Sequence, residues 1–99
     1  MLYMILGREA EDGLERRASA REAHLARLRA LADEGRLVLA GPLPAIDAED
    51  PGPAGFAGSL VVAEFANLER AREWAGADPY IHAGAWASAE VHPFKGVLP

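Results

Sequence analysis

Cysteine is absent from this chain of 99 residues, so disulfide bonds and thiolate chemistry are excluded. No stretch approaches the roughly 18 continuous apolar residues that a membrane-spanning helix needs. The N-terminal segment also lacks the basic region and the apolar length of a signal peptide. Positive charge is scarce, since 10 Lys and Arg face 15 Asp and Glu for a net charge of −5. We therefore expect a cytoplasmic protein whose partner is neither nucleic acid nor a membrane.

The length of the chain fits one domain, residues 1–99, around a single hydrophobic core. Short apolar runs predict strands, and Ala-, Leu- and Arg-rich stretches predict helices. Gly7 is expected to close the first strand and Gly41 with Pro42 the second, while Gly35 and Asn67 are expected to cap the helices. The predicted strands are residues 2–6, 36–40, 58–65 and 86–97, the helices are 14–34 and 67–77, and a loop (42–57) and a short turn (78–80) complete the chain.

This order of elements, β-α-β-β-α-β, predicts an α+β protein of the ferredoxin-like class, with a four-stranded antiparallel sheet and two helices on one face. The predicted strands are apolar on both sides. In the third strand, Leu60 and Val62 point one way while Val61 and Ala63 point the other. Two helices can cover only one face of the sheet, and an apolar face is normally covered. We therefore predict a homodimer in which the sheets of two copies stack.

His24 is the residue that most strongly suggests chemistry. It lies within the predicted helix on the same side as Arg17, Arg21, Leu28 and Leu31, because these positions differ by three, four or seven residues. A side chain that titrates near neutrality, next to two guanidinium groups and an apolar layer, suits proton transfer or anion binding. A histidine satisfied by a backbone carbonyl at the edge of the core is the alternative interpretation.

A catalytic histidine needs a carboxylate to orient it, and the sequence offers Asp47, Asp50, Glu64 and Asp78. We favour Asp78, because the end of the second helix should lie near the middle of the first. Asp followed by Pro is also a common start for a helix, with the Asp as N-cap. Capping alone could therefore explain this residue.

Other candidate sites are weaker. Ser59 opens the third strand, but the G-x-S-x-G pattern of a serine nucleophile is absent. His24, His82 and His92 contain no closely spaced pair of metal ligands. The glycines form neither a dinucleotide-binding nor a phosphate-binding loop. We therefore expect no metal and no cofactor.

Several short motifs, spread over nearly the whole chain from Met1 to about Val97, together resemble the YciI-like (YCII-related) family. The resemblance implies the fold of the dimeric α+β barrel superfamily, whose ferredoxin-like protomers stack their sheets in pairs. It also implies an active site built around a His and an Asp, matched here by His24 and Asp78. The motifs are Arg17, Arg21, His24, Leu25 and Leu28; Glu34 to Leu37; Ala40 to Pro42; Gly55, Phe56, Gly58 and Ser59; Glu64 and Phe65; Asp78 to Tyr80; and Pro93 to Lys95.

Branches related to that family dehydrochlorinate hydroxyquinol-type rings or isomerise muconolactones. The resemblance therefore implies a small cofactor-independent enzyme of lyase, dehydrohalogenase or isomerase type, acting on a small, anionic or cyclic metabolite. His24 would move the proton and Asp78 would orient the imidazole. The predicted substrate-binding residues are Arg17, Arg21, Ser59 and Tyr80.

Two other functions remain open at this point. The first is a non-catalytic module that binds a small molecule or another protein, because a fold does not determine a function. The second is a haem-binding monooxygenase, as in neighbouring barrel families, which would require a histidine that faces the cavity.

Overall fold

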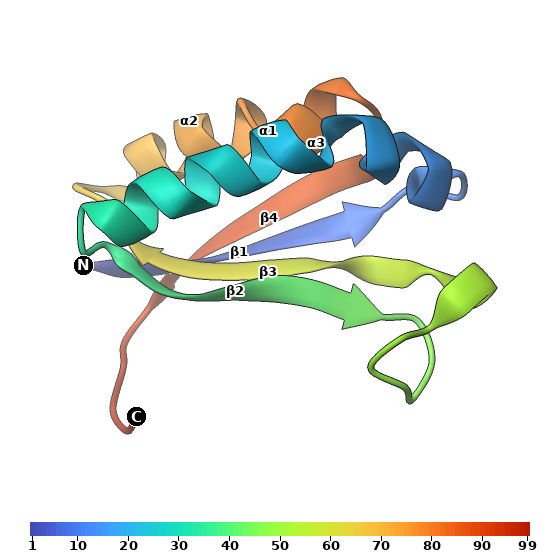
Figure 1. Ribbon diagram of the computed structural model, residues 1–99. Helices are drawn as coiled ribbons and strands as arrows, with labels where there is room; N and C mark the ends of the chain where they lie inside the picture. Colours follow the sequence, from blue (N-terminus) through green and yellow to red (C-terminus); the bar gives the residue numbers. More distant parts are fainter.

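The computed structural model describes residues 1–99 and places the four strands and two helices in the predicted order, with a third, short helix where a turn was predicted. Figure 1 shows one layer of helices lying over one layer of strands. The elements are β1 (Leu2–Glu9), α1 (Gly13–Asp33), β2 (Leu37–Pro44), the 3-10 turn η1 (Gly52–Ala54), β3 (Phe56–Glu64), α2 (Leu68–Gly76), α3 (Pro79–His82) and β4 (Trp86–Phe94).

The four strands form one antiparallel sheet in the order β2-β3-β1-β4, with β1 and β3 in the middle. All three α-helices lie on the same face of this sheet (Figure 1). This is the ferredoxin-like arrangement, so the predicted α+β class and topology are confirmed. None of the helices is both long enough and apolar enough to cross a bilayer.

The long helix α1 packs onto the sheet through one stripe of side chains. Arg17, His24, Leu28 and Leu31 are all buried, and they recur at the spacing of one helical face. The helix ends at Asp33, and Gly35 follows the C-cap with a φ of 73°, the left-handed conformation that glycine adopts without strain. Two polar residues therefore occupy the buried face of a helix that is otherwise anchored by leucines.

Two strands continue past the glycines that were predicted to end them. Gly7 lies inside β1, and a Cβ atom on it would come within 2.3 Å of the Trp86 ring. Glycine is therefore needed there for close packing and not for a turn. β2 likewise runs through Gly41 and Pro42 to Pro44, because an edge strand tolerates proline. β4 ends at Phe94, three residues before the predicted end.

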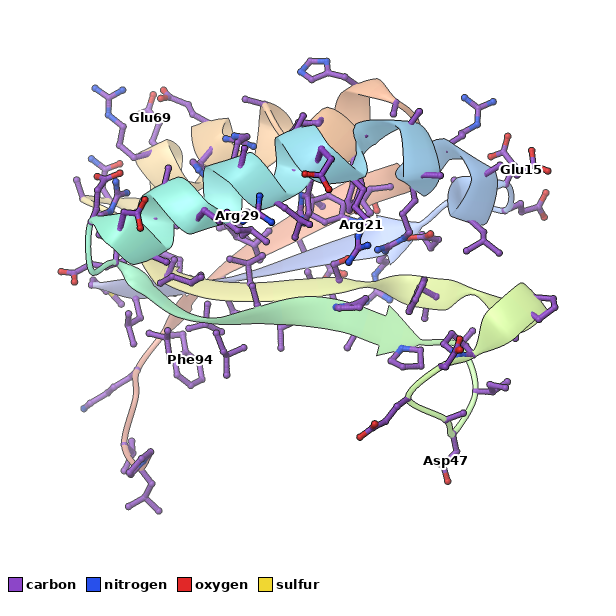
Figure 2. All side chains as sticks on the ribbon, viewed as in Figure 1. Glu15, Arg21, Arg29, Asp47, Glu69 and Phe94 are labelled. Atoms are coloured by element: carbon purple, nitrogen blue, oxygen red, sulfur yellow. The ribbon has the colours of Figure 1, made fainter.

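The two faces of the sheet differ in how far they are covered. Tyr3, Ile5 and Val61 are buried under the helices. Leu39 and Phe94 lie on the opposite face, where they are 50% and 44% exposed. Figure 2 shows the labelled Phe94 projecting from the sheet on the side away from the helices. The chain alone thus leaves one apolar sheet face open, and all of its buried polar groups lie on the helix side.

Candidate functional site

His24 and Asp78 meet on the helix side of the sheet, although 54 positions separate them in the sequence. His24 Nδ1 lies 2.8 Å from Asp78 Oδ1 and 2.9 Å from Oδ2. The imidazole is 5% exposed and the carboxylate is fully buried. A carboxylate can only accept hydrogen bonds when it is ionised, so Nδ1 carries the proton of this contact. The other ring nitrogen, Nε2, is left free for a ligand.

Asp78 is held in place by the start of α3. Its Oδ1 accepts a hydrogen bond of 2.9 Å from the backbone N–H of Tyr80, and Pro79 occupies the first helical position. Arg27, one turn after His24 in α1, donates from Nη1 to Oδ2 at 3.2 Å. Asp78 is therefore both a helix cap and the partner of the imidazole. The structure thus contains both the helix cap and the contact with His24.

Aromatic rings enclose the imidazole. Tyr80 stacks on His24 with centroids 4.0 Å apart and planes 17° apart. The Trp86 ring meets His24 edge-on, with centroids 5.6 Å apart, and packs against Gly7. These contacts fix the ring plane and exclude water from the Nδ1 side. Nε2 is therefore the ring nitrogen without a protein partner.

A second buried ion pair lies on the other side of Tyr80. Arg17 forms a two-pronged pair with Glu9, with Nε to Oε2 and Nη2 to Oε1 both at 2.9 Å. Arg17 Nη2 also donates to Ser59 Oγ at 3.0 Å and to the carbonyl of Gly58 at 3.2 Å. Its guanidinium lies 4.9 Å from the centroid of the Tyr80 ring. Arg17 therefore donates to protein groups through Nε and Nη2.

Between these two pairs, α1, β2 and β3 enclose a cavity of about 150 Å³. Arg21 lines this cavity without forming an ion pair, and Figure 2 shows its side chain on the side of α1 that faces the strands. Five of the six predicted site residues thus line one cavity, and the sixth, Asp78, lies behind His24. The lining residues are Arg17, Arg21, His24, Leu25, Leu28, Ala40, Gly41, Pro42, Ser59, Leu60, Val61 and Tyr80.

Burial shifts the pKa values of two groups around the site. It raises the pKa of the Tyr80 phenol above the usual value, although Arg17 and Arg21 act in the opposite direction. The Tyr80 hydroxyl is thus kept as a hydrogen-bond donor at neutral pH. Burial also lowers the pKa of the Arg27 guanidinium, against the opposing effect of Asp78. Arg27 nevertheless stays charged at neutral pH.

The other candidate carboxylates lie away from His24. Asp47 lies at the tip of the loop between β2 and β3, where Figure 2 labels it, and Asp50 is exposed on the same loop. Glu64 is exposed and pairs with the N-terminal ammonium group at 3.6 Å. His82 and His92 are also exposed. No group of three or more His, Asp and Glu side chains is arranged to hold a metal ion.

Sequence reasoning missed two residues that contact the site, Glu9 and Arg27. Glu9 follows Gly7, which was expected to end the strand, so nothing in the local sequence pointed to a buried acid. Arg27 carried a usable signal, because a residue three positions after His24 lies on the same side of the helix. A carboxylate that reaches His24 from another element is therefore also within reach of Arg27.

A larger and more open groove of about 880 Å³ lies outside this site. Its charged side chains already have partners: Arg36 pairs with Glu34, and Arg70 pairs with Glu73. No buried polar group faces this groove without a partner. The candidate functional side chains therefore gather at the smaller cavity, even though the groove offers more space.

The solved structure of 5-chloro-2-hydroxyhydroquinone dehydrochlorinase (TftG) from Burkholderia phenoliruptrix AC1100, in complex with 2,5-dihydroxybenzoquinone, is similar to this one. The TM-score is 0.81 at 27% sequence identity, and the match covers 96% of this chain and 94% of that chain. The likeness therefore extends over the whole fold and includes every element that contributes to the cavity.

Sequence relatives are more similar still. Protein YciI of Escherichia coli O6:H1 is 58% identical over 98 residues, which cover 99% of this chain and 100% of the relative. An uncharacterized protein of Haemophilus influenzae is 52% identical over the same shares of both chains. The family model described as the YCII-related domain matches residues 1–95. The chain therefore belongs to the YCII-related family.

Proposed function

We propose that this protein is a small enzyme in which His24 moves a proton to or from a small, anionic, cyclic substrate bound in the cavity. The contact between His24 Nδ1 and both oxygens of the buried Asp78 carries this proposal. It leaves Nε2 as the basic nitrogen of a ring that lines the cavity. This arrangement of a base and its orienting acid is the one that general base catalysis requires.

In the proposed reaction, Nε2 removes a proton from a carbon that a neighbouring carbonyl or enol makes acidic. The electron pair of the broken C–H bond moves into the substrate, where it either forms an oxyanion or expels a leaving group with its bonding electrons. His24 becomes an imidazolium ion, and Asp78 stabilises that positive charge through Nδ1. The proton then returns to the substrate at another atom or passes to solvent.

The size and lining of the cavity support this class of substrate. Its volume of about 150 Å³ matches that of a cavity able to hold one benzene ring. Arg21 supplies an unpaired positive charge for an oxyanion, and the hydroxyl groups of Ser59 and Tyr80 can donate hydrogen bonds. Side-chain carboxylates are absent from the lining, so nothing there favours a cationic ligand.

The reaction class draws support from the dehydrochlorinase that shares this fold. Loss of hydrogen chloride requires removal of a proton and departure of chloride, which is the elimination branch of the scheme above. Base catalysis by one positioned group contributes roughly 10²- to 10⁴-fold. The substrate carbon must therefore already be activated, because this factor is too small for an inert C–H bond.

The proposal is tested by solvent exchange. We expect the protein in heavy water to catalyse deuterium incorporation into small cyclic diketones and enols, measured by mass spectrometry. His24→Gln should slow this exchange by about 10²- to 10⁴-fold. His82→Gln, which changes an exposed histidine, is the matched control and should retain the full rate.

Equal exchange by His24→Gln and the parent would contradict the proposal, as would no exchange by the parent. If the parent binds such compounds without exchanging their protons, the protein is instead a small-molecule-binding module of the same fold.

We propose that a second copy of the chain covers the open sheet face. The proposed location is the cytoplasm, because a chain without cysteine needs no oxidising environment. Val38, Leu39 and Phe94 are 56%, 50% and 44% exposed on the open sheet face, and monomers rarely leave such patches uncovered. We expect sedimentation equilibrium to give the mass of a dimer, and Leu39→Glu to give that of a monomer. A monomeric parent would contradict the proposed assembly.

A further inference from the structure

The wall of the cavity that β3 provides contains one hydroxyl group, Ser59, which is 3% exposed. Its oxygen accepts a hydrogen bond of 3.0 Å from Arg17 Nη2. A guanidinium has five N–H donors and no acceptor, so this bond must use a lone pair of the serine oxygen. The proton of Ser59 cannot point toward Arg17.

No protein group takes up that proton, because the contact with Arg17 is the only hydrogen bond of the Ser59 side chain. A buried donor without an acceptor costs about 1–3 kcal/mol, and folded proteins rarely leave one unused. Ser59 lines the cavity, so a molecule bound there is in a position to accept the proton.

Arg17 is fixed tightly enough to control this orientation. Glu9 holds it through two hydrogen bonds of 2.9 Å, and both partners of this ion pair are less than 10% exposed. Its guanidinium also lies 4.7 Å from the centroid of the Phe56 ring and 4.9 Å from that of the Tyr80 ring. Because Glu9 neutralises it, Arg17 offers the cavity little net charge. Arg21 is the free cation.

We propose that Ser59 donates its hydroxyl proton to a negatively polarised oxygen of the bound molecule, and that Arg17, held by Glu9, is the positioning residue that turns this proton into the cavity. The inference rests on the proposed function in one respect, that the cavity is where a small molecule binds. The ligand oxygen is a carbonyl, an enolate or a phenolate, since each of these accepts a hydrogen bond from a hydroxyl group.

This role differs from that of a serine nucleophile. A nucleophilic serine needs a base that removes its proton, but the group that contacts Ser59 Oγ is a permanent cation. Arg17 withdraws electron density from the oxygen and makes the hydroxyl a stronger donor. Ser59 is thus suited to stabilise negative charge on the ligand and not to form a bond to it.

The test measures the affinity of the intact protein for 2,5-dihydroxybenzoquinone by titration calorimetry. Ser59→Ala should weaken binding about tenfold or more, because it removes a hydrogen bond to a charged acceptor. Ser59→Thr keeps the hydroxyl group and should stay within about threefold of the parent. Ser19→Ala, which changes an exposed serine on α1, is the matched control.

The part played by Arg17 is read from a double-mutant cycle. If Arg17 acts through Ser59, Arg17→Lys should weaken binding about fivefold in the parent and less than about twofold in a Ser59→Ala background. If Arg17→Lys prevents folding, Glu9→Asp takes its place, because it keeps the charge and moves the acceptor. A loss that is equal in both backgrounds would overturn the positioning role.

Unchanged binding by Ser59→Ala would overturn the donor role, and so would a parent that does not bind the probe. These outcomes concern affinity alone, whereas the proposed function depends on proton exchange and on His24. A protein that binds the probe through Ser59 but exchanges no protons would contradict the proposed function and leave this inference standing.

Discussion

Two buried carboxylates flank the Tyr80 ring, and the chain uses them differently. Glu9 pairs with Arg17, which keeps its positive charge at any pH that a folded protein experiences. Asp78 pairs with His24, whose imidazole exists in both a neutral and a protonated form. The first pair therefore has a fixed charge state, and the second is the pair whose charge changes in the proposed reaction.

The surroundings of each pair match this difference. Glu9 and Arg17 are both almost fully covered, and hydrogen bonds between them satisfy both carboxylate oxygens. Asp78 also accepts a hydrogen bond from Arg27, whose side chain is 24% exposed and therefore remains partly hydrated. A permanent pair can be sealed completely. In the proposed function, the pair that transfers a proton needs access to the cavity on one side and support for its anion on the other.

The largest effect on stability is expected from Glu9→Gln. This change leaves the Arg17 guanidinium buried without a counter-charge, and breaking a buried pair from one side costs about 3–5 kcal/mol. The free energy of unfolding, measured by urea denaturation, should fall by that amount. Glu15→Gln, which changes an exposed acid in the first turn of α1, should move it by less than about 0.5 kcal/mol. A loss for Glu9→Gln no larger than that for Glu15→Gln would contradict the claim that Glu9 compensates a buried charge.

A smaller loss, of about 1–3 kcal/mol, is expected from Asp78→Asn. The imidazole can remain neutral when its partner loses its charge, and Asn preserves the cap on the Tyr80 N–H. The new amide can donate to Nδ1, so nitrogen-15 shifts of His24 should show the proton moving from Nδ1 to Nε2. A His24 proton that stays on Nδ1 in this variant would contradict the expected exchange of donor and acceptor.

The smallest effect concerns the ring between the two pairs. Burial raises the pKa of Tyr80, so the folded protein holds this proton more tightly than the unfolded chain does. The resulting stabilisation is complete below the ordinary tyrosine pKa of about 10 and is lost as the pH rises through the higher folded value. A difference ultraviolet titration between the parent and Tyr80→Phe should show tyrosinate forming only above about pH 10. Formation below that pH would contradict the burial argument.

Much of the fold could be predicted from the sequence because its signals are local. Alternation in the strands, the amphipathic stripe of α1 and the caps at Gly35 and Asn67 each involve only a few neighbouring residues. The two incorrect strand ends, at Gly7 and at Gly41 with Pro42, have the opposite cause. Each depends on what a neighbouring element places beside the strand, and no local pattern records that.

The residues of the site also divide into those indicated by their local sequence and those placed by contacts between distant elements. Asp78 could be inferred because its own neighbours make it a cap, and the topology brings that cap to α1. Glu9 could not be inferred, because its approach to Arg17 depends on how β1 emerges beneath α1 and on the register that places Arg8 opposite Gly58. Sequence patterns therefore indicated His24, Asp78 and Arg17, and missed Glu9, the partner that holds Arg17.

Gly58 has a consequence that extends beyond its own position. Its φ is 155°, and a Cβ atom there would come within 1.8 Å of the Gly7 carbonyl oxygen. Any other residue would force the two central strands apart. The carbonyl of Gly58 and the neighbouring Ser59 both bind the guanidinium that Glu9 holds from the other strand. The absence of a side chain at Gly58 thus keeps β1 and β3 close enough for Arg17 to bind groups on both strands.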